Sequence, residues 1–289
     1  VKSAKEARDR KVNVVNISED DITFDLGKPT EVGGRIAFNS LEAATQDLAS
    51  GKIDVLVTAP ISKEAMGKSG FEFPGHTEYL ANLSSKSEAL MIMVSGELRV
   101  ALVTIHVPIK EVPGLLTVER IYGKIKELEL SLKKDFGVIK PKIAVFGLNP
   151  HAGENGKMGT EEAEVIIPAI KKAFDEGIMA FGPYPADGFI GSPIRNQFDG
   201  ILAMYHDQGL SGFKALAFDD GVNFTAGLPI VRTSPDHGTA YDIVGKNIAS
   251  PTSMLNAIYV AVDVFRKNQA YKEMNANPLP ITQKGNPDV

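Results

Sequence analysis

Cysteine and tryptophan are both absent from this chain of 289 residues, and histidine occurs only five times. Without cysteine the protein cannot form disulfides, and it cannot bind a metal through thiolates. Any metal would therefore have to be held by histidine, aspartate, glutamate or water. The absence of cysteine does not by itself fix the cellular compartment.

The sequence also lacks long apolar runs and an excess of basic residues. The longest apolar runs, 89–94 and 100–105, are far shorter than the roughly 20 residues that a membrane-spanning helix needs. The N-terminal residues VKSAKEARDR are rich in charge and have no apolar stretch typical of a secretory signal. With a net charge of -5 and a pI near 5.6, the chain lacks the basic balance of nucleic-acid binders. We therefore expect a cytoplasmic protein whose partners include neither nucleic acid nor a membrane.

Short apolar runs rich in β-branched residues alternate with longer segments of helical period, which predicts an α/β fold. Gly96 and Glu97 separate two of the predicted strands and favour a hairpin, so we expect a mixed sheet. FKALAF, which begins at Phe213, and LPIVRT, which begins at Leu228, are also strand-like. The remaining predicted strands are residues 12–17, 53–58, 90–95, 100–105, 142–148 and 201–205.

Longer segments have the apolar spacing of helices. The clearest extends from Thr117 to about Asp135, with Thr117 placed to cap it and Gly137 to end it. A second helix is expected to begin near Thr160, where carboxylates suit the positive end of the helix dipole. A third is expected over residues 253–274. The first of these helices is expected to face the core.

The positions of the histidines are the sharpest functional signal in the sequence. His106, His151 and His206 each stand at or just beyond the carboxyl end of a predicted strand. In open α/β sheets ligands collect at these ends, so the imidazoles could converge on one metal ion and leave a position open for a substrate hydroxyl. The alternative is that each histidine is isolated and satisfied by backbone hydrogen bonds. The histidines have no close spacing such as HExxH, so spacing alone does not decide between these readings.

Loops dense in Gly, Pro, Asn and Asp surround these histidines, and such loops let backbone amides approach an anion. His76 and Thr77 precede a short helical stretch where they could bind an anion, although an ordinary helix cap explains them equally well. Asp187, in GPYPADGF, is more often a turn residue than a catalytic acid.

Three donors follow His206 at intervals of 8, 9 and 9 residues, namely Lys214, Asn223 and Arg232. Singly, each residue of this kind is usually solvated on the surface. Beside a metal, they would supply donors for a carboxylate and a phosphate. No GxGxxG follows a strand, and neither a GxSxG elbow nor a GxxxxGK[ST] loop is present. A Rossmann dinucleotide site, a serine hydrolase and a P-loop ATPase are therefore not indicated.

Several longer motifs occur in order from about Gly33 to the last predicted helix. They are VTAPISKEAM, PGHTEYL, GLNPHAGENGKMGTEE, GPYPAD, MYHDQGL and GVNFTAGLPIVRTSPDHGTA. Their sequence and spacing resemble those of the 4-hydroxythreonine-4-phosphate dehydrogenase family. The resemblance implies a homodimer with the isocitrate and isopropylmalate dehydrogenase type of fold, in which two α/β lobes enclose the active site. We expect a single catalytic unit whose approximate lobes are 1–105 with 200–289 and 106–199.

The same resemblance implies roles for individual residues. The matches to the divalent metal ligands, with zinc, cobalt or magnesium as the ion, are His106, His151 and His206, one of them supplied by the partner subunit. The matches to substrate-binding positions are His76, Thr77, Lys214, Asn223 and Arg232. The matches to the segment beside the adenosine part of NAD are His237, Asp242 and Asn247, and NADP stays open as an alternative. Lys214 or Asp187 is expected to move protons.

The implied reaction is the NAD-dependent oxidation and decarboxylation of 4-phosphohydroxy-L-threonine to 3-amino-2-oxopropyl phosphate, a step of pyridoxal phosphate synthesis. A metal would favour the alkoxide of the C3 hydroxyl and so ease hydride transfer to NAD. One departure from the family pattern is that no GDPAGIGPE-like loop precedes Lys11. We therefore expect that the first few tens of family residues are missing here, so that either the sequence is incomplete or catalysis is in question.

Two alternatives stay open at this point. A sister dehydrogenase would oxidise 4-phospho-threonate, 4-phospho-erythronate or a dihydrodiol carboxylate on the same scaffold. A protein of another class would bind a metal or an anion without catalysis. Failure to bind NAD with normal metal uptake would favour this second alternative, whereas turnover of a sugar-acid phosphate would favour the first.

Overall fold

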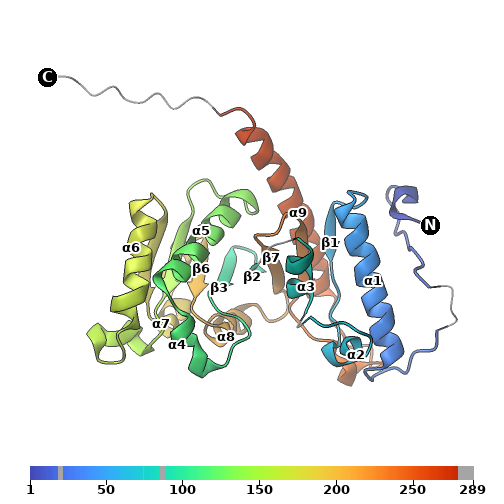
Figure 1. Cartoon of the computed structure of the whole chain (residues 1–289), viewed down its shortest axis with the longest axis horizontal. Coiled ribbons are helices and arrows are strands. Elements are labelled where there is room, and N and C mark those ends of the chain that lie inside the picture. The colour runs from blue at the N-terminus through green and yellow to red at the C-terminus, as the bar shows by residue number, and fades with distance from the viewer. Residues whose placement is uncertain (19–21, 74, 85–88, 279–289) are drawn as a thin grey trace.

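The computed structural model describes residues 1–18, 22–73, 75–84 and 89–278. Its centre is a sheet of eight strands in the order β1-β8-β7-β2-β3-β6-β4-β5, flanked by helices (Figure 1). The strands are β1 Val55–Val57, β2 Leu90–Ser95, β3 Leu98–Leu102, β4 Lys142–Phe146, β5 Met179–Tyr184, β6 Gly200–Ala203, β7 Val222–Ala226 and β8 Val231–Pro235. The helices are α1 Glu31–Ala49, α2 Lys63–Gly67, α3 His76–Leu83, α4 Val112–Leu115, α5 Val118–Lys134, α6 Ile167–Asp175, α7 Ala186–Gly191, α8 His206–Ala217 and α9 Thr252–Asn275.

The sheet is mixed, as the sequence predicts. Strands β2 and β3 form an antiparallel hairpin through Gly96 and Glu97, and β7 pairs antiparallel with both β2 and β8. The pairs β3–β6, β6–β4, β4–β5 and β1–β8 are parallel. The predicted α/β fold with a mixed sheet is therefore confirmed. One continuous sheet runs through both ranges of the predicted lobes, and the boundary between the lobes stays a prediction.

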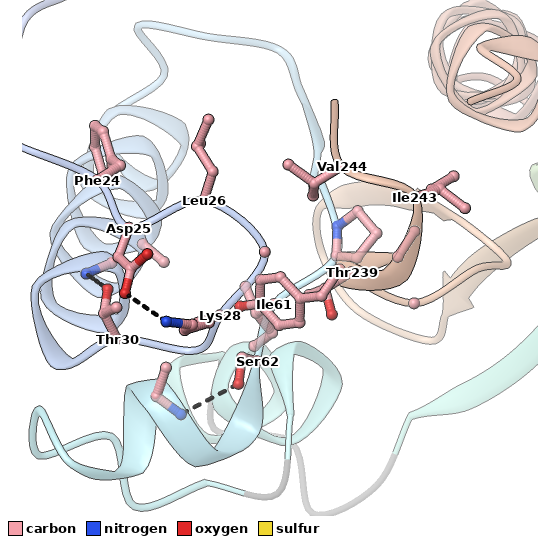
Figure 2. Close-up of a pocket in the computed structure, with 18 of the residues that line it drawn as sticks. Phe24, Asp25, Leu26, Lys28, Thr30, Ile61, Ser62, Thr239, Ile243 and Val244 are labelled. Atoms are coloured by element: carbon pink, nitrogen blue, oxygen red, sulfur yellow. Dashed lines mark hydrogen bonds and ion pairs between the residues drawn. The ribbon is translucent and has the colours of Figure 1, made fainter. Parts of the chain in front are cut away.

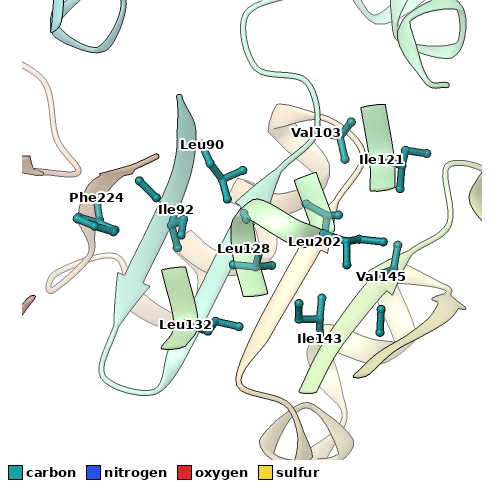
Figure 3. Packing of buried hydrophobic residues seen from close by; sticks show 14 of the residues in the cluster. Leu90, Ile92, Val103, Ile121, Leu128, Leu132, Ile143, Val145, Leu202 and Phe224 are labelled. Carbon is teal, nitrogen blue, oxygen red and sulfur yellow. The ribbon is translucent and has the colours of Figure 1, made fainter. Parts of the chain in front are cut away.

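One face of the sheet packs against α5, α6 and α9, and Figure 3 shows the part of this packing that α5 forms. Ile121, Leu128 and Leu132 of α5 are fully buried against Leu90, Ile143 and Leu202 of the strands. Burying a side chain of this size contributes roughly 1.5 to 3 kcal/mol. The other face packs against α7 and α8, and a separate apolar cluster joins α1, α2 and α3. The sheet is therefore covered on both faces.

Helix α5 forms as its sequence predicts. Thr117 accepts a hydrogen bond at Oγ1 from the Arg120 amide at 3.1 Å, which satisfies one free donor of the first turn. Gly137 follows the helix with φ +72°, a conformation that glycine adopts without steric cost. The predicted third helix corresponds to α9, while the predicted second begins as a π-helical turn, Glu162–Ile166, that continues into α6.

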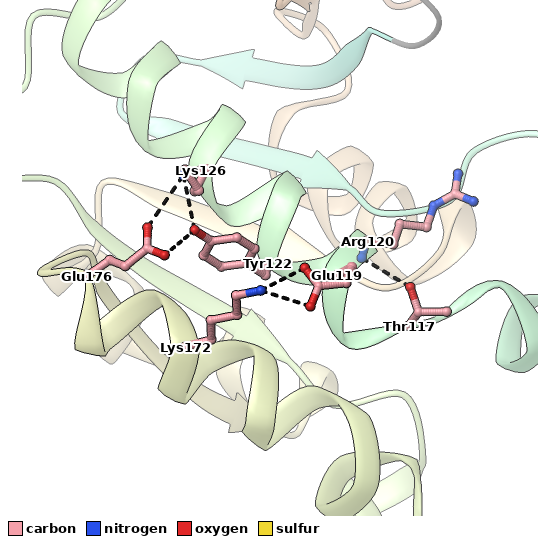
Figure 4. Close-up of polar contacts among 7 residues, drawn as sticks. All are labelled: Thr117, Glu119, Arg120, Tyr122, Lys126, Lys172 and Glu176. Atoms are coloured by element: carbon pink, nitrogen blue, oxygen red, sulfur yellow. Dashed lines mark hydrogen bonds and ion pairs between the residues drawn. The ribbon is translucent and has the colours of Figure 1, made fainter.

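Polar side chains join α5 to α6 on the surface (Figure 4). The Lys172 ammonium contacts both carboxylate oxygens of Glu119 at 2.8 and 2.7 Å and lies 4.4 Å from the centre of the Tyr122 ring. The Tyr122 hydroxyl donates a hydrogen bond to the Glu176 carboxylate, and the Lys126 ammonium donates to the same carboxylate at 3.4 Å. Because such exposed pairs are screened by water, the buried apolar face of α5 holds this helix pair more than they do.

Two predictions about strands are wrong. Residues 12–17 form no strand, and Val12 is 96% exposed, so the alternating pattern has nothing to pack against. The segment that begins at Phe213 belongs to helix α8, where Leu210, Phe213 and Ala217 are buried at helical spacing. A six-residue apolar run does not distinguish the two periods. Among the described residues, no helix has the length and apolar character needed to cross a membrane.

Candidate active site

The predicted histidines follow the carboxyl ends of adjacent parallel strands. His106 lies beyond β3, His206 begins α8 directly after β6, and His151 lies in the loop after β4. Strand β6 stands between β3 and β4 in the sheet. The structure therefore places all three at the edge of the sheet where ligands collect in α/β proteins.

His106 and His206 lie next to each other, with their ring centres 5.8 Å apart. Each ring has its Nδ1 turned toward a carboxylate, since His206 Nδ1 is 2.7 Å from Asp207 Oδ1 and His106 Nδ1 is 3.6 Å from Glu78 Oε1. This arrangement leaves Nε2 of both rings for another ligand. A cavity of about 240 Å³ lies between the two imidazoles and Tyr205.

His151 lines a neighbouring cavity of about 440 Å³ together with Asp187 at the start of α7. Tyr205 and Asp207 line both this cavity and the one at His106 and His206. Within the described part of the chain, no group of three or more His, Asp or Glu side chains is arranged to hold a metal ion. A single copy of the chain therefore brings two of the predicted ligands together and leaves the third in the adjoining cavity.

Arg232, near the start of β8, is a buried cation at the same edge of the sheet. Its side chain is only 3% exposed. The guanidinium donates from Nη2 to Thr58 Oγ1 at 2.7 Å, and from Nη1 to Thr225 Oγ1 at 3.1 Å and Thr77 Oγ1 at 3.5 Å. Burial lowers the pKa of Arg232 to about 10. In the regions that the structure describes, no carboxylate forms an ion pair with this guanidinium, although the charge of Glu78 acts on it.

His76 and Glu78 connect Arg232 to the histidine pair. Burial and the positive charge of Arg232 lower the pKa of His76 to about 3, so the imidazole is neutral at physiological pH. The contact with His106 keeps the pKa of Glu78 below its ordinary value, and the charge of Lys63 acts in the same direction. The first turn of α3 therefore presents a neutral imidazole, a hydroxyl and an ionised carboxylate to the site.

Lys214 lies on α8 and Asn223 on β7. The Lys214 ammonium lies 3.4 Å from Asp236 Oδ1. Burial raises the pKa of Asp236, although the charge of Lys214 opposes this effect. Asn223 shares a face of the sheet with Thr225, the residue opposite Arg232, and its buried Oδ1 has no hydrogen-bond partner among the described residues.

A further cavity, of about 910 Å³, lies between the segments 24–34, 60–66 and 237–249 (Figure 2). Thr30 caps α1 by accepting from the Gly33 amide at 3.1 Å, and Ser62 caps α2 by accepting from the Ala65 amide at 3.2 Å. The amino ends of two helices therefore open into this cavity, which suits an anionic group.

Comparison with known proteins places this chain in a family. The family model described as pyridoxal phosphate biosynthetic protein PdxA matches residues 1–261. The chain belongs to the PdxA family. It is 51% identical over 280 residues to the 4-hydroxythreonine-4-phosphate dehydrogenase of Bacteroides thetaiotaomicron, a match that covers 96% of this chain and 77% of that one. The resemblance inferred from the motifs is thus confirmed.

Solved structures of PdxA relatives share the fold. The 4-hydroxythreonine-4-phosphate dehydrogenase of Burkholderia phymatum has a TM-score of 0.73 at 39% identity, covering 91% of this chain and 81% of that one. The enzyme of the same name from Klebsiella pneumoniae has a TM-score of 0.73 at 38% identity, covering 83% of this chain and 72% of that one.

The structure separates the predicted cofactor residues of this PdxA member into those that line the 910 Å³ cavity and one that does not. His237 and Asn247 line the 910 Å³ cavity, and Asn247 has φ +54°. Asp242 is exposed and is not among the residues that line this cavity. Two of the three predicted residues therefore face one pocket.

Sequence reasoning missed several residues that hold the site together. They are Glu78, Asp207, Asp236, Thr58 and Thr225. All three acidic residues lie inside the quoted motifs. Asp207 and Asp236 each adjoin a histidine, and Glu78 is separated from His76 by one residue. Their adjacency to a histidine was an available signal. The contacts of Thr58 and Thr225 with Arg232 depend on strand pairing, which no local pattern reveals.

Proposed function

We propose that this chain oxidises and decarboxylates 4-phosphohydroxy-L-threonine to 3-amino-2-oxopropyl phosphate, with NAD as the hydride acceptor. The observation that carries the proposal is the Arg232 guanidinium, which is buried beside His76 and Thr77 and forms no ion pair with any residue that the structure describes. The names of the PdxA relatives supply the substrate.

A buried cation without a counter-ion is costly, so its presence at this edge of the sheet favours an anionic ligand. Thr58 and Thr225 hold the guanidinium in one orientation while leaving its charge uncompensated. A carboxylate or a phosphate in contact with Arg232 would supply the missing negative charge. Thr77 and the neutral His76 add hydrogen-bonding groups at the same place.

The donor set near this anion site fits a divalent metal. His106 and His206 each direct Nδ1 toward a carboxylate, the arrangement in which Nε2 binds metals in many proteins. When bound, a divalent cation would act as a Lewis acid on the substrate hydroxyl. We propose that His151 of a second copy completes the donor set, in a homodimer whose subunits share the site. The support is that His151 lines a separate cavity in the single chain.

The nicotinamide cofactor would supply the hydride acceptor, and its adenosine part would occupy the 910 Å³ cavity lined by His237 and Asn247. Lys214 is the candidate for moving a proton, at Nζ, because Asp236 holds this ammonium at 3.4 Å. Asp187, beside His151, is the alternative proton carrier. Asp187 faces the cavity of His151, whereas Lys214 contacts Asp236.

The test is the formation of NADH from 4-phosphohydroxy-L-threonine by metal-stripped protein, before and after zinc, cobalt or magnesium is restored. We expect turnover that requires the restored metal and that is lost in His206→Ala. Turnover of a threonate phosphate, an erythronate phosphate or a dihydrodiol carboxylate instead would move the chain to a sister activity. Metal uptake without NAD binding or turnover would contradict the proposed enzyme and favour a non-catalytic binding protein.

A further inference from the structure

The loop that carries His151 has an unusual backbone. Residues 151–155 all have positive φ, with values of 54°, 50°, 80°, 41° and 56°, and only one of them is glycine. Non-glycine residues rarely adopt this left-handed conformation, and consecutive ones are rarer still. Such a run persists only where surrounding contacts determine it. The contacts that determine this loop therefore bear on where His151 points.

The Glu162 carboxylate supplies these contacts. Oε1 accepts hydrogen bonds from the backbone amides of Leu148 and Asn149, both at 2.8 Å, and Oε2 accepts from Asn149 Nδ2 at 3.0 Å. Glu162 is 4% exposed and begins the π-helical turn before α6. A buried carboxylate with three protein donors fixes the end of β4 relative to α6, directly before the left-handed run.

The space around this carboxylate is closed by glycines. A Cβ at Gly153 would lie 2.5 Å from Glu162 Oε2, and a Cβ at Gly147 would lie 2.9 Å from the Ala152 Cα. A Cβ at Gly159 would lie 2.5 Å from Asn149 Nδ2. The chain thus wraps closely around Glu162, and the wrapped segment contains His151.

We propose that Glu162 is a positioning residue that fixes the direction of His151 and thereby sets the affinity of the active site for a divalent cation. This inference rests on the proposed function, in which His151 is one of the cation ligands. Glu162 does not line the cavity of His151, so it acts through the loop rather than by contact with a ligand. Its role is that of an outer partner, whose loss typically lowers metal affinity about 10- to 100-fold.

The test compares Co²⁺ binding to metal-stripped wild type and Glu162→Gln, followed by the visible absorption of the bound ion. In Glu162→Gln, Oε1 still accepts hydrogen bonds from the two backbone amides. The new side-chain NH₂ group, however, faces Asn149 Nδ2, and two donors cannot form a hydrogen bond with each other. We expect Co²⁺ affinity to fall about 10- to 100-fold while the circular dichroism of the fold is kept. Hydrogen exchange at the Leu148 and Asn149 amides should become faster.

A rescue and a control separate positioning from general damage. In Asn149→Asp combined with Glu162→Gln, the donor and acceptor exchange places. Asn149 Nδ2 also donates to Glu161 Oε2 at 2.7 Å, and in the double variant this partly exposed carboxylate can turn toward solvent. We therefore expect Co²⁺ affinity to recover. Glu176→Gln changes a surface carboxylate directly after the last residue of α6 and should leave Co²⁺ affinity unchanged.

The outcomes distinguish this inference from the proposed function. If wild type binds Co²⁺ through His206 but Glu162→Gln binds it equally well, Glu162 does not position a ligand and only this inference is overturned. If His206→Ala binds Co²⁺ as tightly as wild type, the metal site itself is refuted and the role of Glu162 with it.

Discussion

Replacing Arg232 by methionine should remove activity without destabilising the protein. The fall in the pKa of Arg232 from its ordinary 12.5 to about 10 corresponds to roughly 3 kcal/mol, at about 1.4 kcal/mol per pH unit. This is the cost to the folded protein of holding the buried charge. The lost hydrogen bonds to Thr58 and Thr225 contribute about 1.5 kcal/mol each, the low end for a charged donor, because both acceptors are neutral hydroxyls. These effects oppose each other, so the free energy of unfolding should stay within about 1 to 2 kcal/mol of wild type.

The effect on the substrate should be large. A hydrogen bond to a charged group contributes about 1.5 to 3 kcal/mol, so Arg232→Met should lower kcat/KM about 10- to 100-fold or more. The measurements are urea unfolding and the rate of NADH formation from 4-phosphohydroxy-L-threonine.

The chain offers a matched control in Arg99, another buried arginine, at 5% exposure. Its guanidinium pairs with Glu97 at 3.0 Å, donates to the Asp199 carbonyl at 3.2 Å and lies 4.8 Å from the centre of the Phe136 ring. Arg99→Met should therefore lose about 2 to 3 kcal/mol of stability and keep its activity per folded molecule. If Arg232→Met loses as much stability as Arg99→Met and keeps kcat/KM, Arg232 is a structural residue and the reasoning is refuted.

The remaining predictions concern pH, the metal ligands and packing. The pKa of His76 is about 3 in the folded chain and 6.5 in the unfolded chain, so the unfolded chain binds the proton first as the pH falls. The free energy of unfolding should therefore fall by at most ~1.4 kcal/mol per pH unit below pH 6.5. His76→Asn should lose stability less steeply with falling pH, and equal slopes for the variant and wild type would contradict this pKa. His206→Ala should abolish NADH formation while keeping the circular dichroism of wild type, and retained turnover with unchanged metal content would exclude this histidine as a ligand. A Cβ at Gly34 would lie 2.1 Å from the Ala65 carbonyl oxygen, whereas a Cβ at Gly67 would meet no described atom within 4 Å. Thermal unfolding should therefore show that Gly34→Ala is destabilised by about 2 to 3 kcal/mol and that Gly67→Ala is unchanged or more stable.

Local patterns predict those parts of the fold whose cause is local. The apolar stripe and the Thr117 cap suffice to predict α5, because both act within a few residues. The positions of the histidines follow from strand ends, since parallel neighbours bring their carboxyl ends to one edge. The segment at Phe213 was misread because a short apolar run fits a strand or a helix, and its packing beneath the sheet decides the matter.

The contacts around Arg232 could not be predicted from the sequence. Thr58 lies 174 positions from Arg232 in the chain and Thr77 lies 155 positions away. The pairing of β1 with β8 and of β7 with β8 brings the hydroxyls of Thr58 and Thr225 to the guanidinium, and the position of α3 brings that of Thr77. A sequence pattern shows that an arginine is present, but its burial, and hence its uncompensated charge, appears only once the strands are paired.

The 910 Å³ cavity bears on the stability of the folded chain. One wall comes from residues 24–34 and another from residues 237–249, so a ligand in this cavity would bridge segments near opposite ends of the sequence. Residues 1–18 form no strand and are largely exposed, which leaves the early part of the chain with little packing of its own. A bound ligand would hold residues 24–34 against residues 237–249. A molecule that binds only the folded state raises the free energy of unfolding in proportion to the logarithm of the ligand concentration. The resistance of the early segment to proteases would then follow the supply of that ligand.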